Sequence, residues 1–158
     1  MSGVRLHPAV AEFWRRYLDT LPATHSHRLA RPDAFAFGDS AELANELAAL
    51  VTAGRKRATA SLAIEFTAEG LPLPQAGDVS IVTLHDGTPV AIIETVEVRH
   101  LPFGAVDEAF AAHEGEGDGS MAWWRAAHRS YFGRVCARLG GCFDETTPVI
   151  CRRFKRIT

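Results

Sequence analysis

Two short apolar runs joined by a tight-turn signal constrain this chain more than any other feature. The runs DVSIVTL (78–84) and PVAIIETVEV (89–98) are rich in β-branched residues and flank the dipeptide Asp86-Gly87. Asp-Gly between two such runs is one of the strongest local signals for a β-hairpin. Strands joined by a hairpin are antiparallel, whereas a doubly wound α/β fold needs a helix between successive strands. We therefore predict an α+β fold, a small mixed or antiparallel β-barrel decorated by helices.

Three helices and a closing strand are predicted around these runs. Residues 7–21 carry apolar side chains at helical spacing, and so do residues 121–139, which follow a Ser120 N-cap. For the helix before Gly54, Asp39 is the expected N-cap and Glu42 completes a capping box. Gly54 fits the left-handed position just past that helix. The C-terminal run TPVICRRFKRI (147–157) has no cleanly apolar face, which favours a strand at a sheet edge or lining a cleft.

The segment GRKR (54–57) places three consecutive basic residues between a predicted helix and the strand predicted for RATASLAI (57–64). Alternation along that strand separates an apolar face (Ala58, Ala60, Leu62, Ile64) from a polar face (Arg57, Thr59, Ser61). A lysine at this junction is either a solvated charge near a helix C-terminus or a group that does chemistry or meets a phosphate. If the junction meets the basic tail CRRFKRIT (151–158), the two form a local positive patch despite the net charge of -2.

The acidic segment HEGEGDG (113–119) is predicted to be a loop because of its glycines. Its alternating acids resemble the start of a calcium loop, but Arg125 stands where the closing glutamate is required, which excludes that site. A solvated loop and a weak Mn²⁺ or Mg²⁺ site at Glu116 and Asp118 are the remaining alternatives. His128 falls on the apolar side of the following helix, as a core histidine or as a catalytic base.

Length and composition indicate a single domain, residues 1–158, with a real core. No run approaches the roughly 18 apolar residues of a membrane span, and the N-terminus lacks the apolar run of a signal peptide. The three cysteines (Cys136, Cys142, Cys151) form no close CxxC pair, which argues against a disulfide framework and a structural zinc site. We expect a reduced, cytoplasmic protein with no membrane partner.

Several segments carry a family resemblance: GRKRATAS (54–61), GDVSIV (77–82), IIETVEV (92–98), EAFAAHEGEGDGSMAWWRAAHR (108–129) and VICRRF (149–154). Together they resemble the ASCH domain, most closely its bacterial stand-alone branch. The resemblance covers residues 35–158 and leaves residues 1–30 as an N-terminal helical extension. It implies a PUA-like β-barrel, a fold family associated with RNA and modified nucleosides. ASCH relatives are described as RNA-binding modules, as ribonucleases and as amidohydrolases that deacetylate N4-acetylcytidine.

The resemblance also implies site residues. The amidohydrolase branch uses a lysine, a threonine three residues later, and a glutamate ahead of a capped helix, which correspond here to Lys56, Thr59 and Glu114, with Glu116 as the rival glutamate. The residues expected to bind nucleic acid are Arg55, Arg57, Ser61, Arg153 and Lys155. We favour an RNA-directed protein that binds and cleaves single-stranded RNA. The amidohydrolase, and a non-catalytic module that binds RNA or a modified nucleoside, are the alternatives.

Two expectations about Lys56 follow from its place on the turn. A lysine acts as a base only when its pKa falls from about 10.4 toward neutrality, and both burial and the flanking Arg55 and Arg57 favour that fall. A surface lysine on a turn contributes within about 0.5 kcal/mol to stability. We therefore expect Lys56→Ala to remove turnover and to keep the melting temperature.

Overall fold

A computed structural model describes residues 5–158, which form an α+β fold of two compact units. Of the described residues, the first unit comprises 5–54, 77–94 and 155–158, and the second comprises 55–76 and 95–154. Two long strands, β4 (Pro89–Pro102) and β5 (Pro148–Arg156), each contribute residues to both units. The strand order is β1-β3-β4-β5-β2. The predicted α+β class is confirmed, and the sheet is mixed because β1 runs parallel to β3.

The first unit contains the predicted hairpin. β3 (Val79–Thr83) pairs antiparallel with the first half of β4, and β1 (Asp33–Phe35) pairs parallel with the other edge of β3. The helical elements of this unit are α1 (Pro8–Asp19), the short 3-10 helix η1 (Ser26–Leu29) and α2 (Ala41–Thr52). Val10 and Trp14 of α1 pack with Val79, Ile81 and Ile92 in its core. The apolar stripe predicted for the first helix is therefore its buried face.

The ends of α2 show how far capping signals can be resolved from sequence. The N-cap is Ser40, whose Oγ accepts a hydrogen bond from the backbone N–H of Leu43 at 3.2 Å, so the assignment of Asp39 as the cap was wrong by one residue. Both residue types favour this position, and only the backbone conformation decides between neighbours. The prediction for Gly54 is confirmed: its φ is +76°, in the left-handed region.

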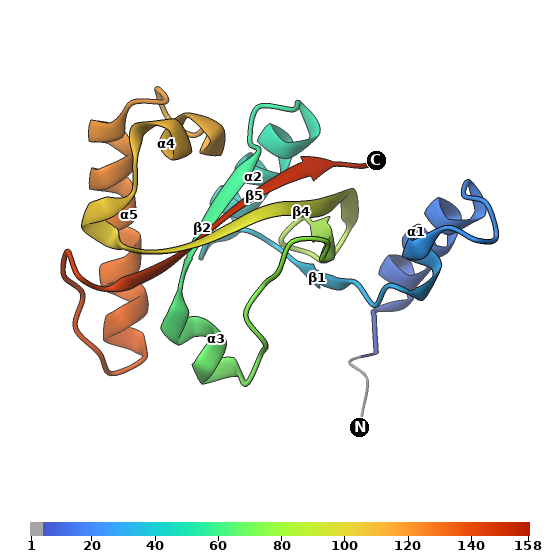
Figure 1. The fold of residues 1–158 in the computed structure, drawn as a ribbon, viewed down its shortest axis with the longest axis horizontal. Coiled ribbons are helices and arrows are strands. Elements are labelled where there is room, and N and C mark those ends of the chain that lie inside the picture. The colour runs from blue at the N-terminus through green and yellow to red at the C-terminus, as the bar shows by residue number, and fades with distance from the viewer. Residues whose placement is uncertain (1–4) are drawn as a thin grey trace. The chain divides into compact units, whose positions relative to one another are not determined.

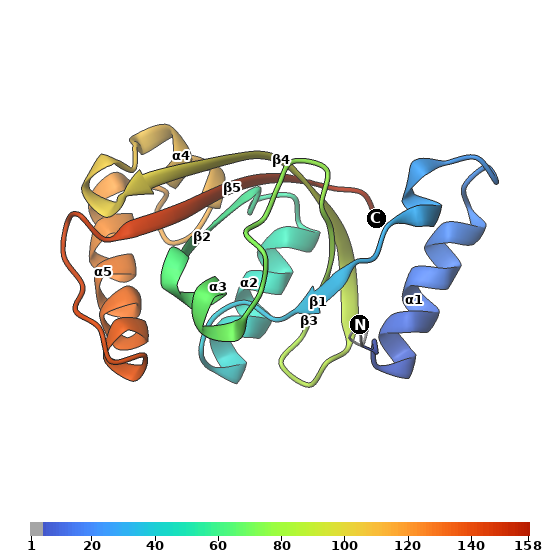
Figure 2. The same cartoon turned by 60° about the horizontal axis from the view of Figure 1, so that its bottom comes forward.

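The second unit is built on the other half of the strands. β2 (Ala58–Leu62) pairs antiparallel with β5, with Ala58 opposite Arg153 and Leu62 opposite Val149. The helical elements are α3 (Ala63–Glu69), the 3-10 helix η2 (Phe103–Ala105), α4 (Glu108–Glu114) and α5 (Met121–Arg138). Figures 1 and 2 show β5 running alongside the second half of β4. β5 is therefore an interior strand, and the prediction of an edge position was wrong.

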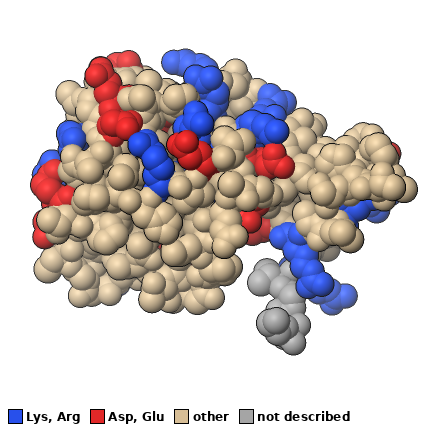
Figure 3. Space-filling view, viewed as in Figure 1, with Lys and Arg blue, Asp and Glu red and all other residues tan. Residues whose placement is uncertain are grey.

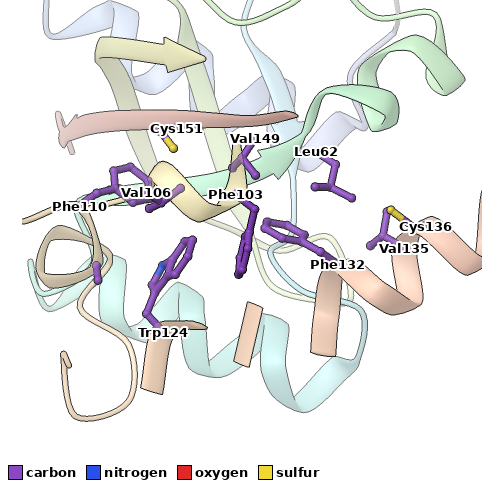
Figure 4. Packing of buried hydrophobic residues seen from close by; sticks show 12 residues of the cluster. Leu62, Phe103, Val106, Phe110, Trp124, Phe132, Val135, Cys136, Val149 and Cys151 are labelled. Atoms are coloured by element: carbon purple, nitrogen blue, oxygen red, sulfur yellow. The ribbon is translucent and has the colours of Figure 1, made fainter. Parts of the chain in front are cut away.

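An aromatic core fills the second unit (Figure 4). The ring of Phe103 stacks on that of Trp124 with centroids 5.5 Å apart and meets Phe132 edge-on at 6.2 Å. Ala58 and Leu62 are buried in this core, and Ala60 and Ile64 pack against it, which confirms the apolar face predicted for this segment. Leu139, the last residue of the predicted apolar pattern 121–139, follows the end of α5 and is exposed.

Two further boundaries differ from the sequence predictions. Strand β2 ends at Leu62, where the backbone N–H donates to the Glu65 carboxylate at 2.7 Å and the chain turns into α3, which was not predicted. The HEGEGDG segment is not a loop throughout, because His113 and Glu114 form the last residues of α4 and the loop begins at Gly115. No helix within residues 5–158 combines the length and apolarity that crossing a bilayer requires.

Candidate functional site

Three segments of the second unit bring charged side chains together. The basic junction ahead of β2 lies against the end of α4, where the backbone N–H of Arg57 donates to the carbonyl of His113 at 2.8 Å. α4 ends at Glu114, and the next residue, Gly115, has a φ of +67° that turns the chain toward Glu116. Helix α5 begins at the predicted N-cap, Ser120, whose Oγ accepts from the N–H of Trp123 at 3.1 Å. These turns place one lysine, two glutamates and one histidine in contact.

Lys56 is the centre of this cluster and is not a solvated charge. Its ammonium donates to the carbonyl of Ala58 at 2.8 Å, to Oε2 of Glu114 at 2.9 Å and to Oε1 of Glu116 at 2.7 Å. The side chains of Lys56 and Glu114 are each only 1% exposed. Lys56 and Glu114, which the family resemblance implied as partners, are therefore in direct contact, and the rival Glu116 joins them.

His128 closes the cluster from α5. Its Nδ1 lies 2.9 Å from the carbonyl of Trp124, and its Nε2 lies 3.3 Å from Oε1 of Glu114 and 4.0 Å from Oε2 of Glu116. Both ring nitrogens thus face acceptors, and only the imidazolium carries two donors. The ring also stacks on Trp124 with centroids 4.2 Å apart, an arrangement that favours a cation.

The opposite charges in the cluster set its protonation states. Burial alone lowers the pKa of Lys56, but the Glu114 and Glu116 carboxylates outweigh it and raise the pKa above its ordinary value. Burial likewise opposes the charge on His128, and Glu114 again raises the pKa of the imidazole. Lys56 is therefore a cation, and the expectation of a lowered pKa was wrong in direction, because the Glu114 and Glu116 carboxylates raise the pKa more than burial lowers it.

The two glutamates differ. Burial raises the pKa of both carboxyls, but at Glu114 the charges of Lys56 and His128 reverse the effect and hold the pKa well below its usual range. At Glu116, burial and the neighbouring Glu114 carboxylate leave the pKa raised, despite Lys56. The Glu116 and His128 side chains are 11% and 9% exposed, so these two members of the cluster are less completely buried than Lys56 and Glu114.

Comparison with known proteins decides the family. The family model for the ASCH domain matches residues 33–158. The chain belongs to the ASCH domain family. Among solved structures, an ASCH domain from Lactobacillus crispatus JV V101 is 34% identical, with 99% of this chain and 98% of that chain covered and a TM-score of 0.90. A protein from Enterococcus faecalis V583 is 33% identical over 94% of this chain and 88% of its own, with a TM-score of 0.82. No curated protein matches. The match to this ASCH structure supports the predicted PUA-like fold.

The threonine implied as a catalytic partner lies elsewhere in the ASCH domain. Thr59 is buried in β2 directly opposite Arg152 of β5. Because Ala58 and Ala60 face the aromatic core, strand alternation turns Thr59 to the other face of the sheet. The hydrogen bonds of Lys56 described above run to Ala58 and the two glutamates instead. The structure therefore brings Lys56 and Glu114 together, whereas Thr59 lies on the face of β2 that points away from the aromatic core.

The basic junction and the basic tail do meet, as one alternative held. The N–H of Phe154 donates to the carbonyl of Arg57 at 3.0 Å. Two charges of the tail are matched by acids, since Arg153 lies 3.3 Å from Glu97 and Lys155 lies 3.1 Å from Glu94. Figure 3 shows basic side chains next to acidic ones on the face in view. Arg55 and Arg57 are exposed, and Ser61 is half-buried.

Of the two expected metal ligands, Glu116 belongs to the charged cluster and Asp118 does not. Ligand atoms of Glu114, Glu116 and His128 all lie within 4.8 Å of one another, a grouping that could hold a metal ion. However, the Lys56 ammonium already bonds to both carboxylates, so a divalent ion would have to displace it or share its charge. Asp118 is exposed and accepts from the backbone N–H of Ser120 at 2.8 Å, where it helps to form the turn before α5.

Gly115 allows the loop to approach the lysine segment. A Cβ at this position would clash with the carbonyl oxygen of Arg55, and the φ of +67° is itself unfavourable for other residues. We expect Gly115→Ala to lower the free energy of unfolding by at least about 2 kcal/mol in urea denaturation. Gly119→Ala is the matched control, because Gly119 has a similar φ of +77° and a Cβ there meets nothing within 4 Å. Equal losses for the two variants would contradict this close-approach argument.

Sequence reasoning missed one functional partner. The indole N–H of Trp124 donates to Oε1 of Glu114 at 3.2 Å and so fixes the carboxylate from the core side. The helical spacing places Trp124 on the predicted buried face, but no sequence signal pairs its indole with Glu114. A helical register anchored on Phe132, eight residues later, selects Trp124 for the buried face. His128 is buried and packs on Trp124 and Phe132, as expected for the core alternative, and it also contacts the charged cluster through Glu114.

Proposed function

We propose that this ASCH domain cleaves single-stranded RNA by general acid–base catalysis, with Glu116 as base and His128 as acid. The observation that supports the proposal is the charge-matched cluster, in which a carboxylate of raised pKa lies 4.0 Å from an imidazolium, each with about a tenth of its side chain exposed. Buried Lys56 bonds to Glu116, buried Glu114 lies 3.3 Å from His128, and these contacts position the pair. The RNA substrate is the one that the family resemblance implies.

The proposed reaction needs only groups present in the chain. The Glu116 carboxylate takes the proton of a ribose 2′-hydroxyl as that oxygen bonds to the adjacent phosphorus. The bond from phosphorus to the 5′-oxygen of the next nucleotide breaks, and that oxygen takes a proton from the His128 imidazolium. The products are a 2′,3′-cyclic phosphate and a 5′-hydroxyl. A base whose pKa is raised toward the working pH is suited to the first transfer.

A cleavage assay tests this proposal directly. We expect the protein to cut a single-stranded RNA oligonucleotide in EDTA, because both proton-transfer groups are side chains, and to leave DNA of the same sequence intact, because DNA lacks the 2′-hydroxyl. Mass spectrometry of the fragments should show 2′,3′-cyclic phosphate ends. Activity that requires Mn²⁺, or fragments with 5′-phosphate ends, would replace this mechanism with a metal-assisted one. Binding without cleavage would favour the non-catalytic reader.

One observation favours an amidohydrolase as a second candidate. The contact between Lys56 and Glu114 reproduces two of the three residues implied by the resemblance to enzymes that deacetylate N4-acetylcytidine. Release of acetate from N4-acetylcytidine would support this candidate. Thr59→Val distinguishes the two mechanisms, because it removes the threonine that deacetylation uses as a nucleophile and leaves Glu116 and His128 unchanged.

A further inference from the structure

Trp123 is the one exposed tryptophan of the three in this chain. Its exposed fraction is 37%, whereas Trp14 and Trp124 are buried. Trp14 packs in the core of the first unit, and Trp124 stacks between Phe103 and His128. Trp123 thus differs from the other two tryptophans in being exposed. A single exposed apolar residue is common on protein surfaces, so the contacts of Trp123 rather than its exposure bear on function.

The indole of Trp123 lies against the loop that carries Glu116. A Cβ at Gly117 would clash with the Cδ2 and Cε2 atoms of the Trp123 ring, so the ring sits directly on the backbone of that glycine. Gly117 has a φ of +57°, and the missing side chain is what admits the ring. Trp123 is also fixed at its backbone by the Ser120 cap. The ring is thus held in place beside the residue that follows Glu116.

The other side of the same loop meets the basic junction. Gly115 packs against the backbone of Arg55, and the Arg55 side chain is exposed. Glu116 therefore lies between a residue that contacts an arginine segment and a residue that contacts an exposed indole. The Arg55 segment and the Trp123 indole thus contact the two glycines that flank Glu116, and a cation and an aromatic ring are the groups that bind the phosphate and the base of a nucleotide.

We propose that Trp123 stacks a nucleobase of single-stranded RNA and thereby places the adjacent ribose at Glu116 and His128. This assignment rests on the proposed function and names the part of the substrate that the site holds. Stacking is sequence-tolerant, because every base has a π-face, and it is denied to bases already stacked in a duplex. Trp123 is a positioning residue, and proton transfer stays with Glu116 and His128.

The test uses intrinsic fluorescence and binding of a six-nucleotide oligoadenylate. We expect the oligonucleotide to quench the fluorescence of the wild type, whereas ribose 5-phosphate and a duplex of the same length do not. Trp123→Ala should lose the quench and weaken binding by about tenfold or more, and Trp123→Phe should retain most of the affinity. Leu139→Ala is the matched control, because Leu139 is also an exposed apolar residue of the α5 region, at its other end.

The outcomes separate this inference from the proposed ribonuclease. If Trp123→Ala binds the oligonucleotide as tightly as the wild type and cleaves it with an unchanged KM, the stacking role is wrong and the ribonuclease stands. If the wild type binds through Trp123 but cleaves no RNA, the ribonuclease is wrong and the stacking role stands. If the wild type shows neither binding nor cleavage, both are wrong.

Discussion

Replacing Lys56 by methionine is expected to lower the free energy of unfolding by about 3–5 kcal/mol. The substitution keeps much of the apolar stem but removes the cation that bonds to Glu114 and Glu116. Glu114 is 1% exposed, so its carboxylate cannot exchange the lost partner for water. Urea denaturation followed by circular dichroism measures the loss. This expectation reverses the one drawn from sequence, in which Lys56→Ala left the melting temperature unchanged.

Two variants control this experiment. Arg55→Met removes an exposed positive charge from the preceding residue, and its effect should stay within about 0.5 kcal/mol. Adding Glu114→Gln to Lys56→Met should recover part of the loss, because the double variant no longer leaves that buried carboxylate without its cation. A Lys56→Met protein as stable as Arg55→Met would show that the ion cluster does not form in solution.

Replacing Glu116 by glutamine is expected to lower the rate of RNA cleavage about 10²–10⁴-fold. Glutamine retains the size of the side chain and an oxygen that can accept from Lys56, so the change removes the base and leaves the shape. His128→Gln removes the acid and should reduce the rate by a similar factor. Asp118→Asn is the matched control for Glu116, because Asp118 is an exposed acid two residues away with no member of the cluster bonded to it.

The pH dependence tests the same assignment. The active form has Glu116 deprotonated and His128 protonated, so the rate rises as pH passes the pKa of Glu116 and falls as it passes that of His128. Both pKa values are raised above the ordinary values of these groups, which moves both limbs of the bell-shaped profile upward. The rising limb should be absent in Glu116→Gln. A profile with the same rising limb in that variant would assign the base to another group.

The features that sequence predicted correctly depend on neighbours along the chain. The Asp86-Gly87 hairpin, the left-handed Gly54 and the Ser120 cap are each decided by the backbone preferences and hydrogen bonds of a few adjacent residues. The apolar face of Ala58, Ala60, Leu62 and Ile64 follows from strand alternation. The family resemblance added Lys56 and Glu114 as partners, which no local rule pairs.

Only the tertiary structure decided the environment of these residues. β5 carries the charged run Arg152-Arg153, which is typical of an edge, yet it lies between β4 and β2, because strand order depends on pairing across long separations. Thr59 lies on the face of β2 opposite to Ala58 and Ala60, because those two residues face the aromatic core and side chains alternate along the strand.

The protonation of Lys56 is the clearest case. From sequence, its charged neighbours are Arg55 and Arg57, and both favour a lowered pKa. In the folded chain its hydrogen-bond partner Glu114 is 58 residues away in sequence, and Glu116 is 60. Electrostatic energy depends on distance in space, and so the two carboxylates outweigh the flanking arginines. Sequence by itself determined that a lysine stands at the turn before β2, and folding determined that this lysine is a buried cation.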